Sequence, residues 1–438
     1  MNEPSAQLAA AGLSGDEAAA KAPLFQTAEG ELGREAAKRW FVPGIIEVFG
    51  KHTDYAGGPS LVCAAERGFS VVACLRRDSK IRVTDALIHE SIEFPLSSEI
   101  AMPGGWANYV ATVIRRIARN FGGAKQGVEI AFASDLPRSA GLSSSSALMI
   151  AIFLAIADAN DLYSRPELAE VASVPEELAA YLACIENGQS YGPFEGDRGV
   201  GTFGGSEDHT AILCSRARRL SHYRFAPVRL EQQVSMPEEW IFVIAHSGVA
   251  ASKTGTARDC YNRLSALAKA VLDVWNRASG RNDRTIAAAL QYSPHAEEIR
   301  KILRNTEGGE FAKAELLSRF DHYALESQLV PAAVRAFADR DTDALGETAE
   351  RSQSAAEQLL GNQTPEISTL AREARKLGAI AASAFGAGFG GSVWAIVPRT
   401  EAQGFMDKWR AAYVRAFPAL APAATVFTTA AGPSIIAI

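Results

Sequence analysis

Apolar positions in the first half of the chain predict a mixed β-sheet backed by helices. Apolar runs broken by glycine at 40–50 and 60–77, followed by alternating patterns at 80–86 and 91–96, are typical of strands. Residues 104–123 place apolar side chains at helical spacing between two glycine pairs, and residues 128–137 predict a strand that leads into a turn. Further helices are predicted at 145–159, 165–173 and 175–187.

The second half predicts an α+β domain. A strand at 240–249 precedes helical patterns at 253–279, 283–305, 309–339, 341–360 and 364–377, and strands at 379–386 and 392–398 flank a glycine cluster. A chain of 438 residues is long enough for two packed domains with a cleft between them. We predict a mobile tail at 1–22, an N-terminal domain at 23–233 and a C-terminal domain at 234–438, with the boundary in a polar connection at 230–237.

The composition of the chain limits the kinds of molecule that it is expected to bind. Hydrophobic residues make up 47% and charged residues 21%, as in soluble globular proteins, and the net charge of −6 comes without a basic run that could follow nucleic acid. The longest apolar run, 148–157, is about half of the roughly 20 residues that a membrane span needs. The five cysteines form no CxxC pair, and the N-terminus lacks a secretory signal. We therefore expect a cytoplasmic monomer or homodimer that binds a small molecule and neither nucleic acid nor membrane.

A serine-rich turn carries the strongest chemical signal. Pro137 turns the chain after a strand, and a small-residue loop then opens a long apolar helix; the loop consists of Gly141, Leu142, Ser143, Ser144, Ser145 and Ser146. Backbone N–H groups and the positive end of a helix suit an anionic phosphate, and a serine hydroxyl could reach magnesium. The alternative is a serine-rich cap on a core helix.

Two further motifs each allow a ligand-binding and a purely structural interpretation. His52 and Asp54 lie beside Gly57 and Gly58, and positions two apart in an extended segment face the same side, where both could reach sugar hydroxyls. A turn capped by Asp54 is the alternative. The glycines at 386, 388, 390 and 391 lie between two strands, where they could line a nucleotide cleft or simply form a tight turn.

In their order and spacing, three segments resemble the galactokinase branch of the GHMP kinases. They are PGIIEVFGKHTDYAGG at 43–58, LPRSAGLSSSSA at 136–147 and SAFGAGFGGS at 383–392, and the resemblance covers nearly the whole chain after residue 40. It implies an N-terminal domain like domain 2 of ribosomal protein S5, a ferredoxin-like C-terminal domain, and ATP with Mg²⁺ in the cleft. The implied reaction is transfer of the γ-phosphoryl group to a monosaccharide hydroxyl, such as the anomeric hydroxyl of galactose.

The resemblance also implies roles for single residues. Asp208 would be the catalytic base, at the start of a helix and next to Glu207. The remaining roles are magnesium ligands at Ser145 and Glu186, a triphosphate cradle at 141–146 after Pro137, an adenine neighbour at Trp106, and sugar contacts at His52, Asp54 and Gly205. Taken alone, Trp106 would be a core aromatic and Glu186 a solvated helix carboxylate.

Three positions depart from the family pattern. Ile45 replaces an arginine that lies near the catalytic carboxylate, Lys51 replaces a glutamate that binds the sugar, and Lys253 falls near an expected sugar-binding tyrosine. One interpretation makes Lys51 the substitute cation beside Asp208 or the γ-phosphate. A variant pairs Lys51 and Lys253 with the carboxylate of a uronic acid. Another class is an ATP- and sugar-binding sensor with weakened catalysis, and a mevalonate- or homoserine-type kinase is a more distant alternative.

Overall fold

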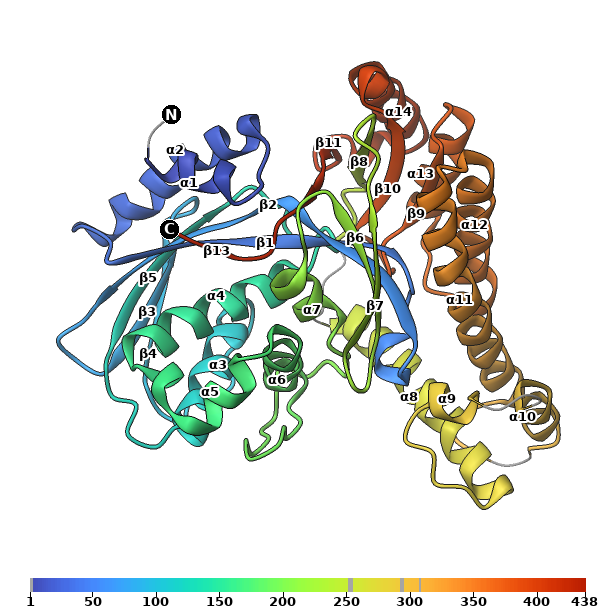
Figure 1. The fold of residues 1–438 in the computed structure, drawn as a ribbon, viewed down its shortest axis with the longest axis horizontal. Helices are drawn as coiled ribbons and strands as arrows, with labels where there is room; N and C mark the ends of the chain where they lie inside the picture. The colour runs from blue at the N-terminus through green and yellow to red at the C-terminus, as the bar shows by residue number, and fades with distance from the viewer. Residues whose placement is uncertain (1–2, 251–254, 292–294, 307–308) are drawn as a thin grey trace.

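The computed structural model describes residues 3–250, 255–291, 295–306 and 309–438, which form two β-sheets with helical layers against them (Figure 1). The larger sheet has the order β13-β1-β2-β5-β3-β4, with β12 and the β6–β7 pair added along β2. Its strands are β1 (Lys38–Phe49), β2 (Pro59–Leu75), β3 (Lys80–Asp85), β4 (Glu90–Pro95), β5 (Val128–Ser134), β6 (Arg219–Arg224), β7 (Arg229–Ser235), β12 (Ala431–Gly432) and β13 (Ile436–Ala437).

Helices cover one face of this sheet (Figure 1). They are α3 (Ala107–Asn120), α4 (Ser144–Ala159), α5 (Pro166–Ala172), α6 (Pro175–Asn187) and α7 (Glu207–Cys214), with the short turn η2 (Leu162–Ser164). The helix α4 is apolar on nearly every side because it lies between β1, β2 and β5 above and α3, α6 and α7 beside it. This burial fixes the position of its N-terminus, which carries the serine loop.

The second sheet is antiparallel, with the order β11-β8-β10-β9. Its strands are β8 (Trp240–His246), β9 (Ala381–Ala384), β10 (Ser392–Pro398) and β11 (Thr425–Thr429). Alternate side chains of β8 enter different cores: Val243 packs with α13 (Pro365–Lys376) and α14 (Ala402–Ala416), whereas Phe242 joins the large core shared with the first sheet. The two domains therefore share one continuous apolar core.

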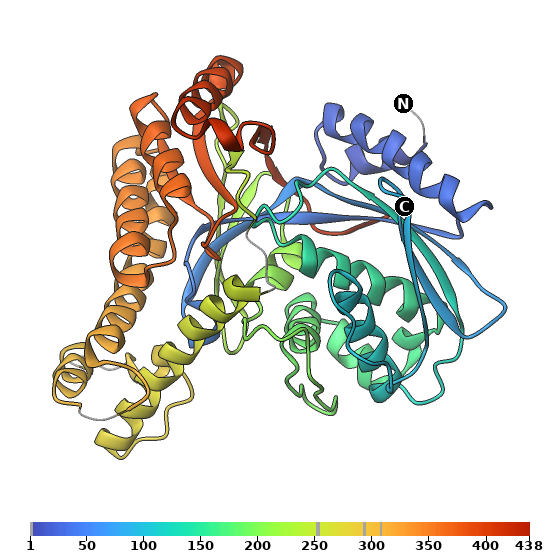
Figure 2. The same ribbon diagram turned by 180° about the vertical axis from the view of Figure 1, so that it is seen from behind.

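The remaining helices extend from the second sheet, as the reverse view shows (Figure 2). They are α8 (Gly255–Ser279), α9 (Ile286–Ala289), α10 (His295–Arg304), α11 (Lys313–Asp339) and α12 (Thr342–Ala355), with the short elements η3 (Ala356–Leu360), η4 (Arg399–Glu401) and η5 (Pro418–Leu420). The short turn η1 (Asp54–Ala56) connects β1 and β2 of the first sheet. The single helix predicted at 283–305 is two helices, α9 and α10. Otherwise these helices agree with the predicted pattern within a few residues.

The prediction of a mobile tail at 1–22 is wrong. Residues 3–10 and 15–32 form α1 (Glu3–Ala10) and α2 (Gly15–Leu32), which lie on the face of the large sheet opposite α4 (Figure 1). Leu8 and Phe25 are buried against Phe41 and Val72 of that sheet. The outer face of the sheet is apolar and needs a cover, and the alanine-rich segment supplies one although its own periodicity is weak.

The predicted domain limits also change. The segment expected to be a polar connection, 230–237, contains most of β7, which pairs with β6 in the first sheet. At the end of the chain, β12 pairs with β2 and β13 pairs with β1, so residues 431–437 belong to the N-terminal sheet although they fall inside the predicted range 234–438. The end of the chain thus adds two strands to the sheet of the first domain. Local sequence patterns do not predict this pairing.

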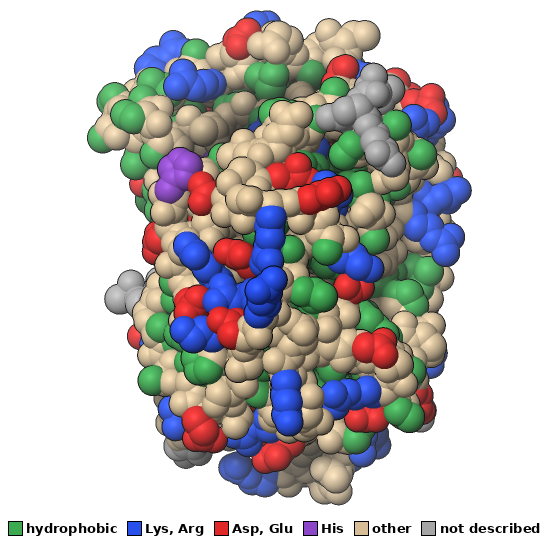
Figure 3. All heavy atoms as spheres, turned by 90° about the vertical axis from the view of Figure 1, so that its left-hand side faces the viewer, with side chains coloured by type: hydrophobic (Ala, Val, Ile, Leu, Met, Phe, Trp, Pro, Cys, Tyr) green, Lys and Arg blue, Asp and Glu red, His purple; other side chains and the backbone are tan. Residues whose placement is uncertain are grey.

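The surface beside β3 and β4 carries lysine and arginine side chains interspersed with carboxylates (Figure 3). Arg76 pairs with Asp78 at 2.7 Å, and Lys80 pairs with Glu93 at 2.7 Å. Opposite charges therefore alternate on this face. Among the described helices, none is both long and apolar enough to cross a bilayer.

Candidate active site

A cleft of about 310 Å³ lies between the two domains. Its walls come from β1, the η1 turn, the serine loop, the ends of α6 and α7, and the glycine loop at 386–391. The sequence-predicted residues that line it are His52, Asp54, Trp106, Gly141, Ser143, Ser144, Ser145, Glu186, Gly205 and Asp208. Folding thus brings together ten residues from five separate parts of the chain.

The serine loop forms an uncapped helix end. Ser143 stands at the N-cap of α4 with a left-handed φ of 57°, and its side chain makes no capping hydrogen bond. The serines therefore do not act as the simple cap that was the alternative to a phosphate site. Ser144 and Ser145 line the cleft at the positive end of this helix. An anion placed there would meet free first-turn N–H groups and two hydroxyls.

One buried hydroxyl joins this helix to two carboxylates. Ser146 Oγ lies 2.7 Å from Glu186 Oε2 and 3.3 Å from Asp208 Oδ2, and its residue is fully buried. Glu186 is on α6 and Asp208 is the second residue of α7, so three helix segments meet at this point. Glu207, which also lines the cleft, accepts a hydrogen bond from Ser60 Oγ at 2.5 Å. Burial raises the pKa of Glu207 well above its usual range, whereas the half-buried Asp208 faces the cleft.

The η1 turn presents Asp54 beside Gly205. A side chain at Gly205 would place its Cβ 2.2 Å from Asp54 Oδ2, so only glycine lets the two segments approach this closely. Asp54 also accepts a hydrogen bond from the Glu207 backbone N–H at 3.3 Å. Asp54, Gly205 and Asp208 therefore form one wall of the cleft.

A buried network orients His52. Arg319 of α11 donates to the His52 carbonyl at 2.5 Å and to the Tyr55 hydroxyl at 3.1 Å, and that hydroxyl lies 2.9 Å from His52 Nδ1. His52 has a φ of 55°, a conformation that needs such support in a residue other than glycine. Arg319 thus fixes, from the C-terminal domain, a side chain that lines the cleft.

Tyr261 and Glu47 are polar cleft residues that were not predicted from the sequence. Tyr261 of α8 lies with its ring 4.9 Å from the His52 ring, and burial raises its pKa well above the usual range. Glu47 of β1 lines the cleft with Ile45, two residues earlier on the same strand. A tyrosine in a helix and a glutamate in a buried strand carry no local signal. The only clue was that the strand runs directly into the His52 motif.

Lys51 is placed differently from the prediction. Its ammonium donates to Ser352 Oγ at 2.6 Å and Ser383 Oγ at 2.9 Å, and lies 3.9 Å from Glu326 Oε1. The side chain is 1% exposed and is absent from the lining of the cleft. Because a buried ammonium needs hydrogen bonds and a counter-charge, it points toward these C-terminal groups. The expectation that Lys51 stands beside Asp208 is thus corrected.

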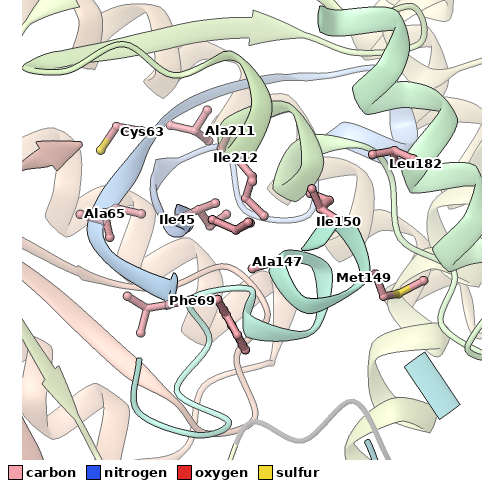
Figure 4. Close-up of a cluster of buried hydrophobic side chains, with 14 of the residues drawn as sticks. Ile45, Cys63, Ala65, Phe69, Ala147, Met149, Ile150, Leu182, Ala211 and Ile212 are labelled. Carbon is pink, nitrogen blue, oxygen red and sulfur yellow. The ribbon is translucent and has the colours of Figure 1, made fainter. Parts of the chain in front are cut away.

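Ile45 takes part in packing at the cleft wall. It is 2% exposed and lies among Phe69, Ala147 and Ile212 in the large core (Figure 4). The side chain at this position therefore supplies apolar contact and no charge. Of the other predicted residues, Trp106 lines the cleft and donates to Glu90 at 3.0 Å, Pro137 and Leu142 are not among the lining residues, and Lys253 falls outside the described residues.

Comparison of the sequence with known protein families gives three matches. Models of the GHMP kinase N-terminal domain, the GHMP kinase C-terminal domain and the galactokinase galactose-binding signature match residues 108–187, 333–415 and 27–75. The chain thus contains regions similar to both domains of the GHMP kinases. The first model ends at Asn187, directly after Glu186, and the signature contains both His52 and Asp54.

Individual GHMP kinases show how far the likeness extends. A galactokinase of Actinobacillus pleuropneumoniae serotype 3 (strain JL03) is 40% identical over 146 residues, which is 33% of this chain but only 38% of that protein. A galactokinase of Roseiflexus sp. (strain RS-1) is 26% identical over 375 residues, 85% of this chain and 86% of the relative. The crystal structure of Lactococcus lactis galactokinase complexed with galactose has a TM-score of 0.76 at 22% identity and covers 94% of this chain and 98% of that one. The structural match establishes the two-domain α+β fold.

Proposed function

We propose that this protein is an ATP-dependent sugar kinase that phosphorylates a monosaccharide, with the anomeric hydroxyl of galactose or a related sugar as the acceptor group. The observation that carries the proposal is the position of Ser146, whose hydroxyl ties the uncapped α4 terminus to Glu186 and Asp208. A phosphate-binding helix end, a metal-binding carboxylate and a candidate base then lie within one hydrogen-bond network. The named galactokinase relatives support the choice of acceptor.

The proposed reaction is a direct transfer. Asp208 accepts the proton of the acceptor hydroxyl, the hydroxyl oxygen forms a bond to the γ-phosphorus, and the bond from that phosphorus to the β–γ bridging oxygen breaks to release ADP. Asp208 lies in the first turn of α7 and lines the cleft. His52, Asp54 and Tyr261 are proposed to hold the sugar hydroxyls, and Trp106 the adenine.

The residues present fit magnesium. Ser145 and Glu186 offer a hydroxyl and a carboxylate oxygen, the donors that Mg²⁺ prefers. The described residues contain no group of three or more His, Cys, Asp or Glu side chains that could hold a metal ion. When bound, Mg²⁺ would neutralise charge on the transferring group. Ser146 would hold Glu186 in place for it.

Lys51 is proposed to join the domains and to take no part in transfer. Its contacts with Ser352 and Ser383 turn it away from an acceptor carboxylate, so of the two lysines in the uronic-acid alternative only Lys253, outside the described residues, would be left to bind one. The sensor alternative predicts binding of ATP and sugar without ADP release.

The test is a coupled ADP-release assay with galactose, comparing the wild-type chain with Asp208→Asn. We expect turnover in the wild type and a loss of at least about 100-fold in the variant, because a positioned base contributes that much. Calorimetry with a non-hydrolysable ATP analogue should give the same affinity for both proteins. Equal turnover in both would refute the role of Asp208, and binding without turnover in the wild type would support the sensor.

A further inference from the structure

The glycine loop between β9 and β10 is held by a buried asparagine that the proposed transfer does not use. Asn362 is fully buried, and its Nδ2 donates to the Gly386 carbonyl at 2.7 Å. Its own backbone carbonyl accepts from the Phe389 N–H at 2.6 Å. A Cβ at Gly388 would lie 2.3 Å from that carbonyl oxygen, so the loop lies directly on Asn362. One residue thus supports the loop along most of its length.

The part of the loop that Asn362 holds faces His52 across the cleft. Gly386 and Ala387 are the described loop residues that line the cleft. The Ala387 carbonyl oxygen lies 3.5 Å from His52 Nε2, and a Cβ at Gly386 would lie 1.8 Å from Glu47 Oε2. A displacement of the loop would therefore change the wall that faces His52, the residue proposed to bind the sugar.

A series of buried hydrogen bonds, here called the Lys51–Asn362 network, leads from the N-terminal domain to this asparagine. The links run from Lys51 Nζ to Ser383 Oγ at 2.9 Å, from Ser383 Oγ to Gln353 Oε1 at 3.2 Å, from Gln353 Nε2 to Gln363 Oε1 at 3.3 Å and from Gln363 Nε2 to Asn362 Oδ1 at 2.7 Å. Every donor in the network therefore points toward Asn362.

The direction of these hydrogen bonds is fixed at both ends. The Lys51 ammonium can only donate, and the Gly386 carbonyl can only accept. Between them, the Ala384 N–H donates to Gln353 Oε1 at 2.9 Å, which fixes the orientation of that amide as well. Because Oδ1 of Asn362 accepts from the network, Nδ2 is presented to the loop. A buried network whose members are satisfied in a single direction is rigid.

We propose that Asn362 is a positioning residue for the acceptor sugar. This inference rests on the proposed function and extends it to a residue that is not among those lining the cleft. Asn362 acts through the loop, because it fixes the Ala387 carbonyl opposite His52 and thereby the space that the acceptor occupies. The Lys51–Asn362 network sets the orientation of its amide, so Lys51 contributes to the geometry of the cleft without lining it.

Asn362→Asp tests the inference, because it keeps the size of the side chain and replaces the donor to Gly386 with an oxygen. Two acceptor oxygens at 2.7 Å repel each other, so the loop must move. In the ADP-release assay we expect the KM for galactose to rise about tenfold, with kcat changed by less than about threefold and the KM for ATP by less than about twofold. Hydrogen exchange measured by mass spectrometry should become at least about tenfold faster in 385–391 and stay unchanged elsewhere.

The matched control is Asn276→Asp, the same change at a side chain outside the lining of the cleft. Asn276 Nδ2 donates to the Asp283 carbonyl at 2.9 Å, and its Oδ1 accepts from the Asp283 N–H at 2.9 Å. The control loses a similar hydrogen bond to a backbone carbonyl. It should nevertheless keep the wild-type KM for both substrates and the wild-type exchange of the glycine loop.

Gln363→Glu is a second variant for the case in which Asn362→Asp does not fold, as circular dichroism would show. Gln363 is half-buried, and a carboxylate at this position cannot donate to Asn362 Oδ1. The change therefore interrupts the Lys51–Asn362 network without touching the loop. We expect the same pattern as in Asn362→Asp, with a rise of about threefold in the KM for galactose.

The outcomes separate the inference from the proposed function. Wild-type KM values and wild-type loop exchange in the variants would overturn the inference and leave the kinase assignment intact. A parallel rise in the KM for galactose and for ATP, or faster exchange throughout the C-terminal domain, would also overturn it, because Asn362 would then support packing in general. If the wild type phosphorylates no sugar, the proposed function fails. Faster exchange confined to the loop, together with weaker galactose binding in calorimetry, would then still support the inference, and an unchanged galactose affinity would overturn it.

Discussion

At the scale of single residues, the cleft depends on side chains held by partners far away in the sequence. Lys51 reaches Ser352 across 301 residues, and Arg319 reaches His52 across 267. Each of these contacts joins the N-terminal domain to the C-terminal helices. Substitutions at such positions should therefore alter the geometry of the site without touching a substrate.

Arg319→Lys tests the support of His52. A lysine cannot donate to both the His52 carbonyl and the Tyr55 hydroxyl in the fork that arginine forms. We expect the KM for the acceptor sugar to rise about tenfold, equivalent to about 1.4 kcal/mol, while the KM for ATP stays within about twofold. Steady-state kinetics in both substrates would show the split.

The control for Arg319 is Arg335→Lys, which changes an exposed arginine on the same helix. It should leave both KM values unchanged. A parallel rise in the KM for ATP in Arg319→Lys would indicate a general loss of domain packing and contradict a specific role at His52.

Glu47 should make the stability of the empty protein depend on pH. Its pKa of about 8 in the folded state exceeds the ordinary value of 4.5, so the folded state keeps the proton that the unfolded state loses as pH rises. The contribution of this proton to the free energy of unfolding is present in full below pH 4.5. It decreases as the pH rises and is lost above pH 8.

Replacing Glu47 with glutamine removes this titration. Relative to the wild type, Glu47→Gln should therefore gain stability progressively from pH 5 to pH 9, reaching on the order of a few kcal/mol. Urea unfolding of both proteins at several pH values, without ligand, measures the difference. A difference that is the same at pH 5 and pH 9 would show that the carboxyl is not protonated by burial.

At the scale of elements, the site is formed by turns and helix N-termini that are packed against the large sheet. The helices α4 and α7 begin at the cleft. Their positions are fixed because their apolar residues are buried against β1 and β2. The η1 turn meets the segment before α7 at Gly205, where contact is closer than any side chain allows. The precision of the site therefore depends on glycines as much as on its polar groups.

Gly205→Ala tests this contact. The new Cβ would fall 2.2 Å from Asp54 Oδ2, so Asp54 must move away from its position in the cleft. We expect the kcat/KM for the acceptor to fall by at least about tenfold, since a displacement of about 1 Å in a site can cost up to 100-fold, with little change in ATP affinity. Kinetics and analogue binding measure the two effects.

Gly404→Ala is the matched control for that change. Gly404 lies within α14, and a Cβ there would meet nothing within 4 Å. Because alanine favours helix, the variant should gain about 0.5–1 kcal/mol of stability and keep full activity. Wild-type kinetics in Gly205→Ala would show that Asp54 is dispensable or able to adjust.

At the scale of the whole molecule, both ends of the chain complete the N-terminal domain. The helices α1 and α2 cover the outer face of its sheet, and β13 adds to its edge beside β1. The cleft-forming strand β1 is thus covered by one end of the chain and paired with the other. Loss of either end should loosen the strand that carries Glu47.

Phe25→Ala tests the cover formed by α2. Phe25 is 2% exposed and packs in the cluster that contains Phe41 of β1. We expect a loss of about 3–5 kcal/mol in the free energy of unfolding, whereas Gln26→Ala, an exposed neighbour, should change it by less than about 0.5 kcal/mol. Equal stability of the two variants would mean that α2 is detached in solution.

The sequence by itself determined the elements and the local chemistry. Helix and strand periods depend on neighbouring residues, so the helix from Ser144, the strand at β1 and the glycine loop were all predictable. His52 and Asp54 belong to the first of the three motifs, whereas Asp208 was assigned through the family resemblance, and all three residues line one cleft.

Only the tertiary structure decided where individual charges point. Lys51 and Glu47 lie four residues apart, yet the first turns toward Ser352 and Ser383 while the second lines the cleft, because their partners come from distant helices and loops. The same holds for Tyr261 and for the cover formed by α1 and α2, whose weak periodicity gains stability from the apolar sheet. Local patterns set which elements form, whereas long-range packing and the cost of burying charge set which side chains meet.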